Sequence, residues 1–352
     1  MMLAPIFHIL PLTTIRRRRV LPVNGKVLVR AGQKVTSREV IAETLLTPEH
    51  ITVDIARGLG VAPKRVAEFL ERAIGDEVAQ DGILAKRSGL TSRVVRAPQA
   101  GRVVAVSGGQ ILLEITNQPY KLRSGMPGDV ASVEPERGAV IETTGVWVQG
   151  VWGNGRLNYG SLTNIADNPD HVLTPKDLDV TQRGSVLLAG HCFQAACLDE
   201  AAEIGLKGLI LGSMAPNLVL KALNMPYPII ILDGFGPQAM NSAAYTLLST
   251  NVSRETTVNA QPLDHFLGQR PEIIISLEST QGGRVPRDID KFAEQQKVRI
   301  LRAPHTGKIA TITAIVPGLT RFPSGLRLPA ADVELDGGKK TLVPLANIEV
   351  LG

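Results

Sequence analysis

The sequence predicts a multi-domain α+β protein in which a β-rich N-terminal module and a small C-terminal β barrel flank a central α/β layer. Three observations lead to this prediction. The chain has 352 residues, which is long enough for about two or three domains. Short apolar runs and helical stretches alternate three times between Ser185 and Leu248. The 34 glycines and 23 prolines indicate many turns and short strands elsewhere.

These observations divide the chain into six segments. The expected segments are an N-terminal arm, 1–20; a β module with a helical insertion, 21–117; a β-rich connecting region, 118–180; an α/β domain, 181–260; a linker with one strand, 261–297; and a small barrel, 298–352.

The central layer rests on three continuous apolar runs, Val186–Ala189, Gly208–Gly212 and Ile229–Leu232. Parallel strands are covered on both faces, so they are apolar throughout rather than alternating. Helical stretches follow the runs at about 193–204, 217–223 and 239–248. We therefore expect three parallel strands joined by helices.

The N-terminus predicts an exposed arm. Met1 to Ile15 is fairly apolar and precedes the run Arg16–Arg19, the reverse of the charge order in a secretory signal. The apolar part is too short to span a bilayer, and Pro5 and Pro11 interrupt it. We expect a mobile or docking arm, with Arg16, Arg17, Arg18 and Arg19 as the candidate contacts to nucleic-acid phosphates.

The first β module is predicted to carry a helical pair. Short strands are expected at 26–29 and 40–43, and Thr47–Pro48 favours the start of a helix with Ile51, Ile55 and Leu59 on one face. A second helix is expected from Pro63. The pair looks like an insertion between two β halves.

The β pattern then returns in the segments 75–85, 94–106 and 111–114. Their order, GDEV, GxILA, APxxGxVxxV and ILLE, resembles the lipoyl- and biotinyl-type barrel-sandwich hybrid over roughly residues 23–115. That resemblance implies a fold found in carrier domains, membrane-fusion adaptors and RNA polymerase subunits. Carrier members hold a modified lysine at a hairpin tip, but neither Ala42–Thr47 nor Ala97–Ala100 contains lysine. No biotin, lipoyl group or other cofactor is therefore expected.

The connecting region and the C-terminal segment are predicted to be β-rich. Strands are expected at 140–143, 146–152, 271–277, 309–312, 331–335 and 341–344, with a loop at 281–284. The closing stretch Val343–Val350 resembles an SH3-like barrel of the KOW kind. Arg96–Val103 also matches Arg302–Ile309, which indicates either a reused turn-and-strand device or an internal duplication.

Composition limits the function classes. The net charge of +5 permits polyanion binding, but aromatic residues make up only 4% of the chain, which disfavours base stacking. We therefore expect at most weak, phosphate-dominated nucleic-acid binding. Only two cysteines occur, which excludes a disulfide framework and favours a reducing, cytoplasmic setting.

His191, Cys192 and Asp233 are the catalytic candidates, because each follows an apolar strand where α/β folds place ligand loops. Cys192 would act as a nucleophile if it stood at a helix N-terminus, but the favoured interpretation is that both cysteines pack as small apolar residues. No metal is expected. The spacing of Cys192 and Cys197 lacks a second matching pair, and the remaining histidines are scattered at His8, His50, His171, His265 and His305.

Glycine-rich turns after the same strands are the ligand-binding candidates, since free backbone N–H groups there can hold an anion. These candidates are Gly190, Gly212, Ser213, Asn217, Gly234 and Gly236. The sequence contains neither GxGxxG nor GxxxxGK[ST], so dinucleotide and P-loop sites are excluded. Residues 184–192 and 205–210 faintly resemble protease-associated and swivelling β/α/β domains, which mostly bind, gate or carry.

The leading functional hypothesis is a non-enzymatic scaffold or regulatory protein that binds a macromolecular partner or a small ligand. The alternative is an enzyme with a thiol- or anion-binding site at the strand ends near His191, Ser213 and Asp233. The two are distinguished by whether polar groups converge in a pocket around a titrating residue.

Overall fold

The computed structural model describes residues 3–46, 49–89, 92–115, 119–264, 269–277, 286 and 289–352. Three sequence expectations fall outside these ranges: the helix start at Thr47–Pro48, His265, and the loop 281–284. Within the described residues the protein is β-rich, with several mixed sheets and short helices, as the α+β class requires.

A 12-stranded mixed sheet forms the centre of the molecule. Its order is β15 (Trp152–Gly153), β20 (Ile229–Phe235), β19 (Gly208–Met214), β18 (Ser185–Cys192), β16 (Leu157–Asn164), β21 (Glu255–Asn259), β22 (Glu272–Ser276), β14 (Gly138–Gln149), β13 (Gly128–Glu134) and β4 (Lys34–Val35), with β17 (Val172–Leu173) beside β18 and β2 (Ile9–Val20) beside β14.

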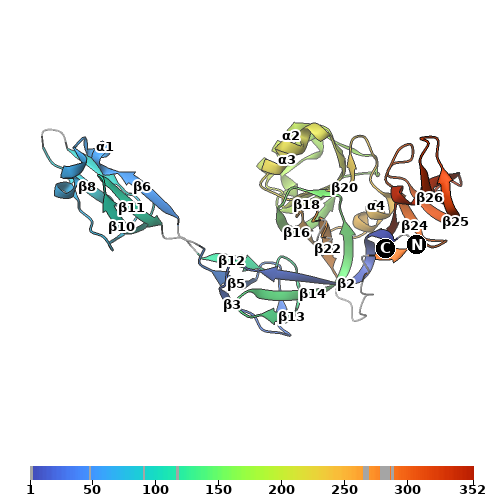
Figure 1. Ribbon diagram of the computed structural model, residues 1–352, viewed down its shortest axis with the longest axis horizontal. Helices are drawn as coiled ribbons and strands as arrows, with labels where there is room; N and C mark the ends of the chain where they lie inside the picture. Colours follow the sequence, from blue (N-terminus) through green and yellow to red (C-terminus); the bar gives the residue numbers. More distant parts are fainter. Residues whose placement is uncertain are drawn as a thin grey trace.

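The strands β18, β19 and β20 run parallel, which confirms the expected parallel layer. Helices α2 (Ala195–Ile204) and α3 (Val219–Asn224) pack on one face of these strands, and α4 (Ser242–Ser249) packs on the other. The three apolar runs are buried because both faces are covered. Figure 1 shows this layer beside the C-terminal sheet.

The prediction of an exposed N-terminal arm is wrong. Residues 3–20 form β1 (Leu3–Phe7) and β2, and β2 pairs with β14 along nearly its whole length. The reason is a two-residue alternation: Thr13 and Ile15 are buried, while Arg16 and Arg18 face solvent. The β2–β14 ribbon runs from a small β unit into the central layer (Figure 1).

The small β unit contains a three-stranded sheet of β12 (Tyr120–Arg123), β5 (Val40–Thr44) and β3 (Lys26–Val27). Its buried side chains come from segments far apart in the chain, among them Ile15, Val35, Ile41, Met126 and Ile141. Residues 26–44 therefore share a core with residues 126–147 rather than with the segment that follows them.

Residues 50–115 have a core of their own. They form a sheet of β6 (His50–Asp54), β11 (Gln110–Ile115), β10 (Gly101–Ser107) and β7 (Glu77–Val78), a hairpin of β8 (Ile83–Arg87) and β9 (Arg93–Arg96), the helix α1 (Ile55–Leu59) and a 3-10 helix, η1 (Pro63–Phe69).

The expected helical pair in this segment needs correction. Residues 50–54 are a strand paired with β11, and only 55–59 are α-helical. Ile51, Ile55 and Leu59 have helical spacing, but Ile51 and Val53 also alternate as a strand requires, and the neighbouring strand favours the second pattern.

The C-terminal segment forms a seven-stranded sheet. Its order is β23 (Ile289–Lys291), β1, β28 (Ile348–Leu351), β24 (Lys297–Ile300), β25 (Ile309–Arg321), β26 (Arg327–Leu335) and β27 (Lys340–Pro344). No sheet closes on itself within the described residues. The two chain ends lie together, because β1 pairs in parallel with β28 (Figure 1).

Four further 3-10 helices occur in the loops: η2 (Pro175–Asp177), η3 (Val180–Gln182), η4 (Pro216–Leu218) and η5 (Leu345–Asn347). Among the residues described, no helix is long and apolar enough to cross a membrane.

Candidate functional site

The carboxyl ends of β18, β19 and β20 share one edge of the sheet, as their parallel order requires. His191, Ser213 and Gly234 stand in one row, since His191 pairs in register with Ser213 and Ser213 with Gly234. Three of the sequence candidates are therefore neighbours in space.

Ser213 and His191 form a hydrogen bond, with 2.6 Å between Ser213 Oγ and His191 Nδ1. Asp170 Oδ1 lies 3.8 Å from the other ring nitrogen. Burial lowers the pKa of His191 despite the nearby Asp170 carboxylate. Ser213 is fully buried, so its hydroxyl has no route to a substrate, and the pair links two strand ends.

Cys192 does not occupy the position that would activate it, whereas Cys197 lies in the first turn of α2 and its hydrogen bond with Cys192 lowers its pKa. Cys192 is the last residue of β18, and α2 begins only at Ala195. Both thiols are buried, and the hydrogen bond to Cys197 together with burial raises the pKa of Cys192. Cys197 Sγ lies 3.4 Å from the Leu173 carbonyl oxygen. This placement does not favour a thiolate nucleophile.

The glycine candidates have packing or turn roles. A Cβ added at Gly190 would lie 2.0 Å from the His171 carbonyl oxygen, and one at Gly212 would lie 2.9 Å from Met240 Cα. Gly234, near the end of β20, and Gly236, just after that strand, adopt positive φ. Asn217 is exposed on η4.

Asp233 is engaged in a buried ion pair that joins the α/β layer to the C-terminal sheet. Its Oδ1 lies 3.0 Å from Arg299 NH1, and its Oδ2 accepts a hydrogen bond from the Asn241 backbone at 2.8 Å. Burial raises the pKa of Asp233, against the opposing charge of Arg299. Both side chains are almost completely buried, so Asp233 positions the loop that follows it.

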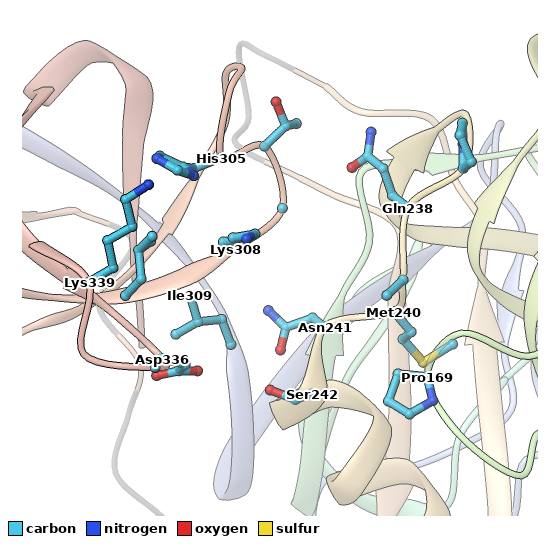
Figure 2. Close-up of a pocket in the computed structure, with 16 residues that line it drawn as sticks. Pro169, Gln238, Met240, Asn241, Ser242, His305, Lys308, Ile309, Asp336 and Lys339 are labelled. Atoms are coloured by element: carbon cyan, nitrogen blue, oxygen red, sulfur yellow. The ribbon is translucent and has the colours of Figure 1, made fainter. Parts of the chain in front are cut away.

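That loop and the C-terminal sheet enclose a cavity of about 580 Å³. In Figure 2, Gln238, Met240 and Asn241 on one wall face His305, Lys308 and Ile309 on the other. The walls approach closely: a Cβ added at Gly307 would lie 3.3 Å from Gln238 Oε1. The cavity size is typical of a small-molecule site.

Among the residues that the structure describes, three buried polar atoms of this lining have no hydrogen-bond partner: Gln238 Oε1, Asn241 Nδ2 and His305 Nδ1. The orientation of Asn241 is fixed, because its Oδ1 accepts from the backbone N–H groups of Ala243 and Ala244 and caps α4. Its amide nitrogen is therefore a free donor, and the Gln238 oxygen is a free acceptor.

The lining also carries an excess of positive charge. Lys308 and Lys339 line the cavity, and Asp336 is the one carboxylate among its described lining residues. The N-terminus of α4 adds a partial positive charge at Ser242. Together these groups can hold an anion whose hydroxyl or amine hydrogens reach Gln238.

The candidates from the sequence lie at the edge of the sheet next to this cavity, but none of them lines it. They include Asp233, Gly234 and Gly236, and the cavity begins just beyond them at Pro237. The opposite wall, 305–309 and 335–339, lies in a segment for which the sequence predicts only short strands and the repeated motif, with no site. The one available signal was the cluster His305, Lys308 and Lys339 in predicted turns.

The four arginines of the former arm are all held in place. Arg16, Arg17 and Arg18 pair with Glu142, Glu272 and Glu134 respectively. Arg19 Nε donates to the Ser124 carbonyl at 3.0 Å. They belong to a strand and not to an exposed basic arm.

In the part of the chain that the structure describes, no group of three or more His, Cys, Asp or Glu residues could hold a metal ion. No protein-family model and no curated protein matches this chain.

Proposed function

We propose that this chain is a non-enzymatic binding protein that holds a small anionic ligand between α4 and the C-terminal sheet. The observation that carries the proposal is the set of three unpartnered polar atoms, on Gln238, Asn241 and His305, around one cavity. A buried polar atom without a partner costs about 1–3 kcal/mol. Native proteins rarely leave several of them around one cavity, and a ligand would supply the missing partners.

The chemistry of the lining selects the ligand class. Asn241 Nδ2, the two lysines and the α4 N-terminus favour negative charge, as at other helix N-termini that bind phosphate or carboxylate. Gln238 Oε1 requires a donor, which a hydroxyl or amine provides. A phosphorylated or carboxylated metabolite with hydroxyl groups satisfies both requirements.

The sequence resemblances of roughly residues 23–115 to barrel-sandwich hybrids and of 298–352 to KOW-type barrels stay part of this proposal, although residues 26–44 and 50–115 belong to two separate cores. Members of both groups bind or carry other molecules. A macromolecular partner for such modules is compatible with a small regulatory ligand, and we place the protein with scaffold or regulatory proteins of the cytoplasm on that basis.

The proposal is tested by calorimetric titration of the full chain with inorganic phosphate, glycerol 3-phosphate and AMP. Replacing Asn241 by Asp keeps the helix cap but exchanges the free donor for a carboxylate, so binding should weaken by about ten-fold or more. Lys339→Ala should also weaken binding. Its matched control is Lys340→Ala, because Lys340 is the next residue and does not line the cavity.

Binding of none of the three probes, or equal binding by the Asn241→Asp and wild-type proteins, would contradict the proposal. Loss of binding in the Lys340→Ala control would indicate a general charge effect and not this site.

The enzyme alternative is favoured by the His191–Ser213 hydrogen bond beside Asp170. A fluorophosphonate probe tests it directly, because such probes label activated serines. We expect no labelling, since Ser213 is buried. Labelling that disappears in Ser213→Ala would establish a serine nucleophile.

A further inference from the structure

A second cavity, of about 1010 Å³, lies beside β2 and β12 and away from the α4 pocket. Its lining includes the cations Arg18, Arg19, Lys121 and Arg123, and Asp264 is the one carboxylate among the described lining residues. Arg18 is paired with Glu134, at 2.6 Å, and Arg123 donates to the Arg38 carbonyl at 2.6 Å. With Arg18 neutralised by Glu134, the other charged lining residues still carry a net positive charge.

Arg19 differs from the other three arginines of its strand. Arg16, Arg17 and Arg18 each contact a carboxylate, whereas Arg19 donates to the Ser124 carbonyl. Its NH2 atom is buried and has no hydrogen-bond partner. Burial lowers the pKa of Arg19, which means that the folded protein disfavours its charge.

A charged guanidinium is costly to bury unless it is paired and hydrogen-bonded. At an ordinary structural position a carboxylate would supply the pairing, as Glu134 does for Arg18. Here the arginine lines a cavity that has further cations on its wall. An anionic ligand is the partner that this arrangement lacks.

We propose that this cavity binds the phosphate backbone of a single-stranded nucleic acid, with Arg19 as its buried anchor. The size of the cavity and the spread of cations along β2 and β12 fit a chain of phosphates better than a single one. Tyr120 on the same wall is 41% exposed and offers one ring to a base. A basic groove with an aromatic side chain is typical of single-strand binding.

Fluorescence anisotropy with a fluorescein-labelled twelve-nucleotide oligouridylate, titrated with the full chain in about 50 mM salt, tests the proposal. Arg19→Gln removes the charge and keeps a polar side chain, so affinity should fall by about ten-fold or more. Arg16→Ala is the matched control. It lies on the same strand, pairs with Glu142 and does not line the cavity, so the change should stay below about two-fold.

Lys121→Ala provides a second variant on the opposite wall and should weaken binding in the same direction. Equal affinity of wild type and Arg19→Gln, or no binding of the oligonucleotide by the wild type at low salt, would overturn the proposal. Inorganic phosphate serves as competitor. If the oligonucleotide binds no more tightly than phosphate alone, the site holds one phosphate group and the nucleic-acid assignment is wrong.

Discussion

Arg299 and Arg19 are two largely buried guanidiniums with opposite surroundings. Arg299 contacts Glu349 through two of its nitrogens, and its NH1 reaches the Leu232 carbonyl at 2.9 Å and Asp233 at 3.0 Å. Its guanidinium carbon lies 3.9 Å from the centre of the Phe7 ring. Among the described residues, Arg19 contacts one backbone carbonyl, its buried NH2 atom has no hydrogen-bond partner, and the residue lines a cavity. A fully paired buried charge holds parts of the fold together, whereas an incompletely paired one indicates a binding site.

The same contrast separates the residues at the buried strand ends from the residues that line the α4 cavity. His191 and Ser213 are buried and hydrogen-bonded to each other, and Cys192 is buried and hydrogen-bonded to Cys197. Gln238, Asn241 and His305 are equally polar but leave atoms unpartnered around a cavity. Satisfied polar groups there are structural, and unsatisfied ones point to a ligand.

The largest expected effect is on the paired arginine. Arg299→Met leaves the buried carboxylates of Asp233 and Glu349 without their main cation, so the free energy of unfolding should fall by about 3–5 kcal/mol. Urea unfolding measures it. Lys297→Ala, an exposed position on the same strand, is the control and should change stability by less than about 0.5 kcal/mol. A loss below about 1 kcal/mol for Arg299→Met would show that the ion pair does not hold the C-terminal sheet on the α/β layer.

An intermediate effect is expected at Arg17. Its guanidinium pairs with Glu272, which also accepts from Trp147 Nε1 at 2.8 Å and from Asn259 at 3.1 Å. Because these donors remain in Arg17→Gln, stability should fall by only about 1–3 kcal/mol. The double change Arg17→Gln with Glu272→Gln should recover part of the loss. If it recovers nothing, Arg17 stabilises the fold through packing on Trp147 and not through its charge.

The central layer could be predicted because its signal is local. Continuous apolar runs such as Ile229–Leu232 indicate buried parallel strands whatever the rest of the chain does. The run Arg16–Arg19, in contrast, was predicted to be an exposed arm and forms part of a paired strand. Its partners lie far away in the sequence: 116 residues separate Arg18 from Glu134, and 255 separate Arg17 from Glu272. Without those partners, four consecutive arginines favour a solvated arm.

The candidate site shows the same limit. One wall, from Gln238 to Ser242, lies where parallel strand ends predict a pocket, and sequence reasoning reached its border. The other wall comes from His305, Lys308 and Lys339. These residues lie near Gln238 and Ser242 only because the C-terminal sheet packs against the α/β layer. No local pattern encodes that docking, since it depends on Arg299 meeting Asp233.

A smaller effect should appear in the pH dependence of stability. Burial raises the pKa of Glu272, but the charge of Arg17 and the surrounding hydrogen bonds outweigh it, so its pKa lies below the ordinary 4.5. The unfolded chain therefore binds the proton first as pH falls. The stability that Glu272 contributes is present above pH 4.5 and is lost as pH falls through the lower folded pKa. Urea unfolding of Glu272→Gln should show a shallower loss of stability below pH 4.5 than wild type. An identical acid profile for the two proteins would mean that the ion pair is not formed in solution.

The smallest expected effect is at Arg19, and it distinguishes the two kinds of buried arginine most sharply. Arg19→Gln removes a charge that burial disfavours and that no carboxylate contacts, so stability should change by less than about 0.5 kcal/mol, or rise. The same substitution should weaken oligouridylate binding, which no loss of folding would then explain. Urea unfolding and anisotropy on one preparation measure both effects. A stability loss near that of Arg17→Gln would show that Arg19 is paired in solution, with Glu272 the nearest carboxylate that acts on its charge. In that case the cavity beside β2 would lose its anchor, and the structural role would replace the binding role.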